Sequence, residues 1–310
     1  MLSVIIPTLN EGKYLPGLMD ALNEQTCRPD EIIIGDGGSH DDTMTLALAR
    51  GAIVVGGGNP AGGRNAGARV AKGEIFQFFD ADVLPHPDYI ARAVDEFIKA
   101  GYAIATSLIE PLDGEPGDRV YTDAVNLYRQ IVRTTVPHAP GYCILVRREV
   151  HEAIGGFDET LKLSEDQDYV RRASQYGEFG ILTSARLTVS MRRIHKEGLP
   201  ALAIKYLWCE LQALEGKPVR SLPFEYEFGD FEETTSERAH SLIDIGELRA
   251  QLGDFENPLQ YLSRAGKRQL ERLAEQSSEE AESAPESLPA AAAYVLYDAG
   301  ASACSTNTYP

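Results

Sequence analysis

The first half of the chain alternates between short apolar runs and segments in which apolar residues recur with helical spacing. Strands separated by helices of this length predict a parallel sheet with helices on both faces. We therefore expect an α/β fold in which helices flank a mostly parallel central sheet. The strand-like runs lie at 2–6, 31–34, 52–55 and 74–79, and the helical segments lie near 11–25, 41–50, 65–72 and 90–98.

The second half is less regular. Ser164 and Gln167 fit the capping-box pattern, so we expect a helix to begin there. We expect one α/β domain over residues 1–225, a helical extension over 226–275 and a low-complexity, disordered tail over 276–310, where Ser, Glu, Pro and Ala dominate. The other expected segments are helices at 120–133, 148–154 and 199–214 and strands at 141–146, 180–182 and 186–190.

Composition and charge exclude several classes of function. The formal net charge of −18 argues against a nucleic-acid-binding protein, and it requires that any anionic substrate meet a local group of cations. The four cysteines form no C-x-x-C pair, which predicts neither a zinc site nor a redox motif. We identify no secretory leader and no run of the roughly 20 apolar residues that span a bilayer. We expect a cytoplasmic protein, with at most peripheral contact with the inner face of the membrane.

Polar residues follow three of the strand-like runs. Asn10-Glu11 comes after the first run, Asp36 after the second and Asp80-Ala81-Asp82 after the fourth. In a parallel α/β sheet, ligands bind outside the carboxyl ends of the strands. We therefore expect these residues to meet at one edge of the sheet and to form one binding site.

The Asp80-x-Asp82 pattern is short, and aspartates are common in loops because they suit turns. Its place directly after the apolar run 75–79 favours a functional interpretation. Two carboxylates at that point can hold a hard divalent cation, which in turn chelates a diphosphate. Such a cation acts as a Lewis acid toward a departing nucleotide.

Two glycine-containing stretches have a structural and a functional interpretation. In 35–43, Ser39 and Asp41 are expected to cap the next helix, whereas Asp36 is placed to accept a hydrogen bond from a nucleobase N–H. The stretch 56–63 loosely fits a dinucleotide fingerprint, but it follows the third strand rather than the first and contains a proline. We expect a flexible loop there, with Arg64 just beyond it pairing with phosphate.

Several motifs stand in a fixed order along the chain. They are Pro7-Thr8-Leu9-Asn10-Glu11, Asp36-Gly37-Gly38-Ser39-His40-Asp41-Asp42-Thr43, Gly63-Arg64-Asn65-Ala66-Gly67, Phe79-Asp80-Ala81-Asp82, Arg147-Arg148-Glu149, Gly155-Gly156-Phe157-Asp158-Glu159 and Glu165-Asp166. In this order and spacing the chain resembles family-2 glycosyltransferases with the GT-A fold over about residues 2–196. One departure is Gly35-Asp36, where many relatives carry two acids, so that Asp36 alone would recognise the base.

The resemblance implies an inverting enzyme that moves a sugar from a UDP- or GDP-sugar to an acceptor hydroxyl, with Mn²⁺ or Mg²⁺ as cofactor. It implies Asp166 as the general base, and Gly141, Tyr142 and Glu165 as the acceptor region. The metal would be held by Asp80, Asp82 and His195. The residues implied around the nucleotide are Pro7, Thr8, Asn10, Glu11, Asp36, Gly63, Arg64, Asp80 and Ala81.

Asp166 and His195 also have plain structural interpretations. Acids are common in the first turn of a helix because they complement its dipole, and the dipole is expected to keep Asp166 ionised, as a base requires. A lone histidine near arginines is usually a surface or core residue, although some GT-A enzymes place a metal-binding histidine in this region. Arg192, Arg193 and Lys196 serve either the diphosphate or a solvated face.

Other functions stay open at this point. The acceptor is a glycan, a lipid-linked compound or a small molecule. A polyprenyl-phosphate sugar synthase is an alternative, because Asp80-Ala81-Asp82 is followed by His86-Pro87. A nucleotidyltransferase lacks support, since no G-x-G-x-R loop follows the first strand. A non-catalytic sugar-nucleotide-binding protein is the alternative outside the enzymes.

Overall fold

A computed structural model of the protein describes residues 1–112 and 116–198 and the single positions 202, 205, 206, 208, 209, 212, 219, 220, 222 and 224. Only single positions of the expected helix at 199–214 are among the described residues. The expected extension at 226–275 and the tail at 276–310 lie outside the described residues. No helix in the described part of the chain is long and apolar enough to cross a membrane.

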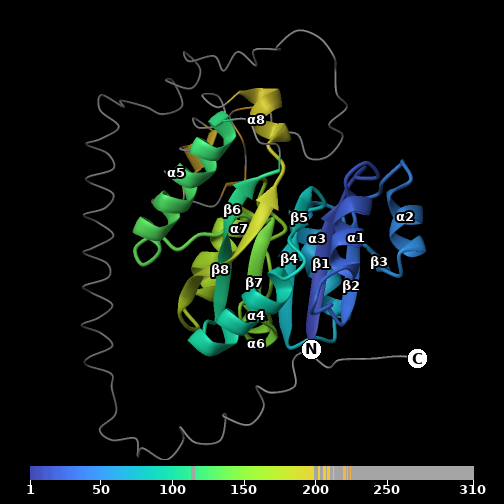
Figure 1. Ribbon diagram of the computed structural model, residues 1–310, viewed down its shortest axis with the longest axis horizontal. Helices are drawn as coiled ribbons and strands as arrows, with labels where there is room; N and C mark the ends of the chain where they lie inside the picture. Colours follow the sequence, from blue (N-terminus) through green and yellow to red (C-terminus); the bar gives the residue numbers. More distant parts are fainter. Residues whose placement is uncertain are drawn as a thin grey trace, which may run out of the picture.

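Within these residues, a single eight-stranded sheet has the order β3-β2-β1-β4-β7-β6-β8-β5 (Figure 1). The first four strands along the chain, β1 to β4, pair in parallel, and β7 runs antiparallel between β4 and β6. β8 then pairs parallel to β6, and β5 closes the edge antiparallel to β8. The strands are β1 (Leu2–Thr8), β2 (Glu31–Asp36), β3 (Ile53–Gly56), β4 (Ile75–Phe79), β5 (Val83–Pro85), β6 (Ile104–Pro111), β7 (Cys143–Arg147) and β8 (Phe179–Val189).

Helices cover both faces of this sheet, and each face has its own hydrophobic core. Val4 and Ile6 of β1 point to one core and Ile5 to the other, as the alternation along a strand requires. The first core packs against α1 (Leu15–Asn23), α2 (Thr43–Ala49) and α4 (Tyr89–Ala100); the second packs against α3 (Pro60–Val70), α6 (Arg148–Ala153) and α7 (Glu165–Ala173). These two layers confirm the expected α/β fold with a mostly parallel sheet and flanking helices.

Residues 60–63 before Arg64 are helical, so the expected loop at 56–63 is wrong for its second half, and only 57–59 lie between β3 and α3. α3 begins at Pro60, and the side chain of Asn59 caps it by accepting a hydrogen bond of 2.8 Å from the Gly62 N–H. The glycines serve close packing: a Cβ added to Gly63 would lie 2.8 Å from the Gly35 carbonyl oxygen. They therefore bring the first turn of α3 against the backbone of β2.

The expected capping box at Ser164 is also wrong. Ser164 stands at the N-cap of α7 but has φ 61°, and its side chain makes no capping hydrogen bond. The left-handed backbone turns the chain sharply into α7. The sequence pattern does not predict β6, which lies inside the sheet, and it predicts two short strands where β8 is continuous.

Candidate active site

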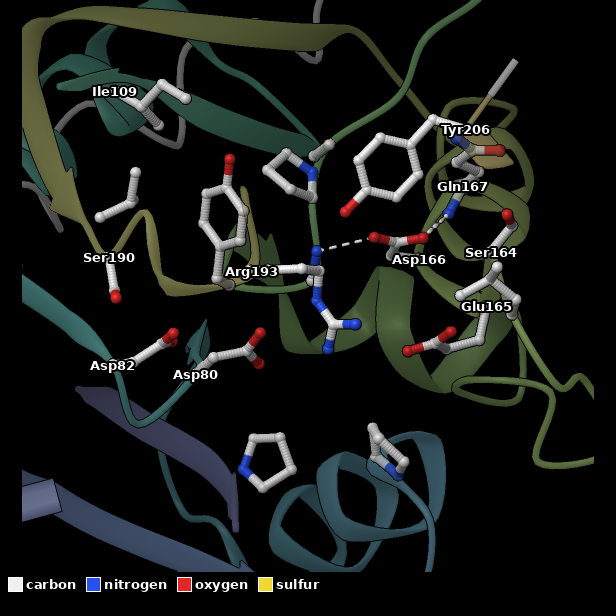
Figure 2. Close-up of a pocket in the computed structure, with 18 of the residues that line it drawn as sticks. Asp80, Asp82, Ile109, Ser164, Glu165, Asp166, Gln167, Ser190, Arg193 and Tyr206 are labelled. Carbon is white, nitrogen blue, oxygen red and sulfur yellow. Dashed lines mark hydrogen bonds between the residues drawn. The ribbon is translucent and has the colours of Figure 1, made fainter. Parts of the chain in front are cut away.

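A cavity of about 880 Å³ opens beyond the carboxyl ends of β1 and β4 (Figure 2). The first turns of α7 and α8 (Arg192–Glu197) and one side of α5 (Pro116–Val132) supply its other walls. Four of the expected site residues are not among its lining: Asn10, Asp36, Gly63 and His195. The expected residues that do line it are Pro7, Thr8, Glu11, Arg64, Asp80, Ala81, Asp82, Gly141, Tyr142, Glu165 and Asp166.

Arg64 links the two sides of this cavity. This residue, in the first half of α3, is 2% exposed. Nη2 lies 2.8 Å from Asp80 Oδ1 and Nη1 lies 2.9 Å from Glu165 Oε1. In this conformation the guanidinium is committed to two protein carboxylates rather than open to a phosphate, and it fixes the end of β4 relative to the start of α7.

Gly141 packs against the guanidinium of Arg64. A Cβ at this position would lie 2.4 Å from Arg64 Nη2, closer than real Cβ atoms approach. The Gly141 N–H donates a hydrogen bond of 2.8 Å to Asp166 Oδ2. The absence of a side chain therefore lets the backbone before β7 touch both Arg64 and Asp166.

Asp166 is half-buried, and its carboxylate lies at the cavity wall (Figure 2). Its Oδ1 accepts a second hydrogen bond of 2.8 Å, from the Gln167 N–H. Burial raises the pKa of Asp166 to about 7, and the charge of Glu165 adds to the shift, while Arg64 and the two N–H groups oppose it. The expectation that the helix dipole keeps this carboxylate ionised is therefore wrong in direction, because desolvation is the larger effect.

Asp82 and Glu11 share one cation, Arg192. Arg192 Nε lies 2.8 Å from Asp82 Oδ2, and the two Nη atoms lie 2.8 and 3.1 Å from the Glu11 carboxylate oxygens. Burial nevertheless raises the pKa values of both acids. From the sequence, Arg192 is expected either to bind the diphosphate or to lie on a solvated face. In this structure it pairs instead with Glu11, after β1, and with Asp82, after β4.

His195 lies apart from these acids. Its Nε2 is 3.1 Å from Asp118 Oδ2 of α5. Within the described residues, no three His, Cys, Asp or Glu side chains are grouped so that they could hold a metal, so His195 is not grouped with Asp80 and Asp82 in this structure. His86, which suggested the polyprenyl-phosphate alternative, is also outside the cavity: its Nε2 contacts Glu110 Oε1 at 2.6 Å.

Asp36 and Asn10 do not line the cavity but hold the loops after β1 and β2. Asp36 accepts hydrogen bonds from the Gly38 and Ser39 N–H groups at 2.9 Å, and from the hydroxyls of Ser39 at 2.6 Å and Thr8 at 3.2 Å. Burial raises the pKa of Asp36, but these hydrogen bonds outweigh it and hold the pKa below its usual range. Asn10 has φ 54°, and its side chain accepts a hydrogen bond from the His40 N–H. Both residues therefore tie the loops after β1 and β2 together.

α5 forms a wall of the cavity that the sequence motifs do not predict. Asn126 and Arg129 are buried, and the amide of Asn126 binds both backbone groups of Ile109, at 3.0 Å to N and 2.7 Å to O. Ile109 and Arg129 line the cavity. The i, i+3 spacing of two polar residues on an otherwise half-apolar helix was the signal that could have identified this wall.

Comparison with known proteins agrees with this geometry. Residues 3–155 match the family model described as glycosyl transferase family 2. An uncharacterized glycosyltransferase of Rickettsia typhi is 26% identical over 205 residues, which are 60% of this chain and 64% of that protein. Glycosyltransferase AglE of Haloferax volcanii is 26% identical over 196 residues, or 56% of this chain and 62% of AglE. The chain thus spans less than two thirds of the length of these relatives.

The fold has a match among solved structures. The mannosyltransferase PcManGT from Pyrobaculum calidifontis, solved in complex with GDP-Man and Mn²⁺, superposes with a TM-score of 0.54 at 22% identity. The match covers 69% of this chain and 63% of PcManGT, and it confirms the expected GT-A architecture. Through residues 3–155, this chain therefore belongs to glycosyl transferase family 2.

Proposed function

We propose that the protein transfers a sugar from a nucleotide diphosphate donor to an acceptor hydroxyl, with inversion at the anomeric carbon. One observation carries the proposal: Asp80 and Asp82 face the same cavity as Asp166 (Figure 2), and the ion pairs of Arg64 with Asp80 and Glu165 bridge its two sides. One side of the cavity thus offers carboxylates for the leaving group, and the other offers a base for the attacking group.

The donor lies at the carboxyl end of β1 in this proposal. Pro7, Thr8 and Glu11 line the cavity there, and Asp36 holds the Thr8 hydroxyl from behind. The complex of PcManGT with GDP-Man supports a nucleotide-linked sugar as donor, which here is a UDP- or GDP-sugar.

Asp80 and Asp82 fit a divalent cation, Mn²⁺ or Mg²⁺, because both lie on the cavity wall and provide hard oxygen ligands. Burial and then the negative charge of Asp80 raise the pKa of Asp82 against the opposing effect of Arg192, so a second positive charge would relieve this repulsion. Two carboxylates suffice when substrate phosphates and water complete the coordination. A bound cation would supply Lewis-acid stabilisation of the leaving diphosphate.

Asp166 acts as the general base. Its two hydrogen bonds, from Gly141 and Gln167, fix the carboxylate and leave lone pairs for the acceptor hydroxyl. A base with a pKa near the working pH is partly ionised and still accepts a proton strongly. As the acceptor oxygen bonds to the anomeric carbon, its proton passes to Asp166 and the bond to the diphosphate breaks on the opposite side.

A panel of UDP- and GDP-sugars tests the proposal, with Mn²⁺ present or with EDTA. We expect one nucleotide to bind more tightly with Mn²⁺, and Asp82→Ala to abolish that difference. Equal binding of every nucleotide with and without metal, in wild type and Asp82→Ala alike, would contradict it. Binding without hydrolysis or transfer to any hydroxyl acceptor would instead support the non-catalytic binding protein. The cytoplasmic location stays a prediction that cell fractionation can test.

A further inference from the structure

Arg129 is a buried cation in the wall of the candidate active site. Its side chain is 2% exposed and lines the cavity from α5. Nη2 donates to the Ser107 carbonyl oxygen at 3.1 Å and to Asn126 Oδ1 at 3.0 Å. Nε and Nη1 are buried as well and have no hydrogen-bond partner among the residues that the structure describes. Three N–H donors of the guanidinium are therefore unused within this part of the chain.

Arg64 provides the comparison within the same cavity. It is buried to the same degree, at 2% exposure, but two carboxylates neutralise it. Arg129 forms no ion pair with any part of the described chain. A buried charge without a counter-ion is costly, and unpaired buried donors add to the cost. A protein with a net charge of −18 has no general attraction for anions. A buried arginine in the cavity wall, without a carboxylate partner in the described chain, therefore provides a local positive charge that an anion can bind.

The fold holds this guanidinium in a fixed place. β7 pairs with β6 only at Ile104 and Ala105. Farther along β6, the Asn126 side chain makes the hydrogen bonds that a neighbouring strand would make, with the N–H and the carbonyl oxygen of Ile109. Arg129 donates to the carbonyl oxygen of Ser107. α5 is thereby attached to the sheet through its polar side chains, and Arg129 cannot leave the cavity wall without breaking these contacts.

Arg129 lies beside the acceptor region. Burial raises the pKa of the Tyr142 phenol, and the Arg129 cation partly offsets this effect, so the guanidinium is within electrostatic range of Tyr142. Tyr142 follows Gly141, whose N–H holds Asp166. The cation is therefore near the residues that flank the proposed base, whereas the donor carboxylates Asp80 and Asp82 have their own cation partners in Arg64 and Arg192.

We propose that the acceptor carries an oxyanionic group, a phosphate or a carboxylate, and that Arg129 binds this group through its free N–H donors. Charge-assisted hydrogen bonds of this kind position a substrate as well as bind it. The inference rests on the proposed transfer to an acceptor and adds the chemical class of that acceptor. The oxyanion belongs either to a water-soluble compound or to a lipid-linked one.

Thermal unfolding in the presence of inorganic phosphate tests the site without turnover. The protein is first saturated with UDP or GDP and Mn²⁺, so that phosphate cannot use the donor site, and ionic strength is held constant with chloride. We expect phosphate to raise the Tm of the wild type, and Arg129→Gln to weaken the apparent phosphate affinity about tenfold or more. Arg147→Gln is the matched control, because Arg147 binds the Tyr102 carbonyl oxygen and does not line the cavity. It should respond as the wild type does.

The outcomes separate the two proposals. Failure of UDP and GDP to bind would sink the proposed function, whereas a phosphate effect that depends on Arg129 would still support the oxyanion site. Nucleotide binding with no phosphate effect, or with an effect equal in wild type and Arg129→Gln, would overturn the oxyanion site alone. If Arg129→Gln does not fold, Arg129→Lys keeps the charge and is expected to lose part of the phosphate affinity. Full phosphate affinity in both Arg129→Lys and Arg129→Met would overturn the site.

Two phosphomonoesters then distinguish the source of the oxyanion. Glycerol 3-phosphate represents a water-soluble acceptor and farnesyl phosphate a lipid-linked one. Stronger stabilisation by either, lost in Arg129→Gln, supports the site and identifies the source. Stabilisation by both that does not depend on Arg129 contradicts it.

Discussion

Arg192 and Asp82 form an ion pair with 2.8 Å between Nε and Oδ2, and the same guanidinium binds Glu11. The carboxylate proposed to hold a divalent cation is thus already occupied by a cation of the protein. Because Arg192 stands at the start of α8 and stacks over the ring of Tyr14 at 4.5 Å, metal binding at Asp82 has to compete with a well-held side chain.

Removal of this competitor should strengthen metal binding. We expect Arg192→Gln to bind Mn²⁺ several-fold more tightly than the wild type in the absence of nucleotide, as measured by titration of free Mn²⁺ in electron paramagnetic resonance. Arg193→Gln makes the same change of net charge one residue away, where the arginine pairs with Glu197, and should have a smaller effect. Mn²⁺ affinity that falls in Arg192→Gln would mean that Arg192 organises the site rather than competing for it.

The glycine at position 141 should be hard to replace. Gly141→Ala forces a Cβ against Arg64 Nη2 and disturbs the bridge from Asp80 to Glu165, for which overpacking predicts a loss of about 1–3 kcal/mol in the free energy of unfolding. Gly17→Ala in α1 is the control, since a Cβ there meets nothing within 4 Å and alanine favours a helix. Denaturant unfolding measures both, and equal stability of the two variants would show that Arg64 yields without cost.

The raised pKa of Asp166 also predicts a pH dependence of stability. The unfolded carboxyl has a pKa of about 3.9, so between that value and the higher folded pKa the folded protein keeps a proton that the unfolded chain has lost. Stability of the wild type therefore decreases as the pH rises through this window. Asp166→Asn does not titrate, and its Tm relative to the wild type should increase from about pH 5 to about pH 8. A Tm difference that is constant or falls with pH would contradict the shift.

The sequence predicted the local parts of this site and missed those made by distant packing. Asp80, Asp82 and Glu11 line one cavity as expected, because parallel strands end at one edge of the sheet, whereas Asn10 and Asp36 do not line it. The direction of the Asp166 pKa shift could not follow from its place in a helix, since it depends on burial by other elements and on Glu165. The contact of Arg192 with Asp82 joins segments far apart in the chain, which no local pattern encodes.

The pH dependence of sugar transfer in wild type and Asp166→Asn tests the central claim most directly. With the donor and acceptor identified by the panels above, kcat/KM of the wild type should rise with pH through an apparent pKa near neutrality, as Asp166 becomes ionised. Asp166→Asn should lower kcat by on the order of 10²-fold or more, abolish this rise and leave the Kd of the nucleotide within a few-fold. Turnover of Asp166→Asn near the wild-type rate, with the same pH profile, would contradict the assignment of Asp166 as the base.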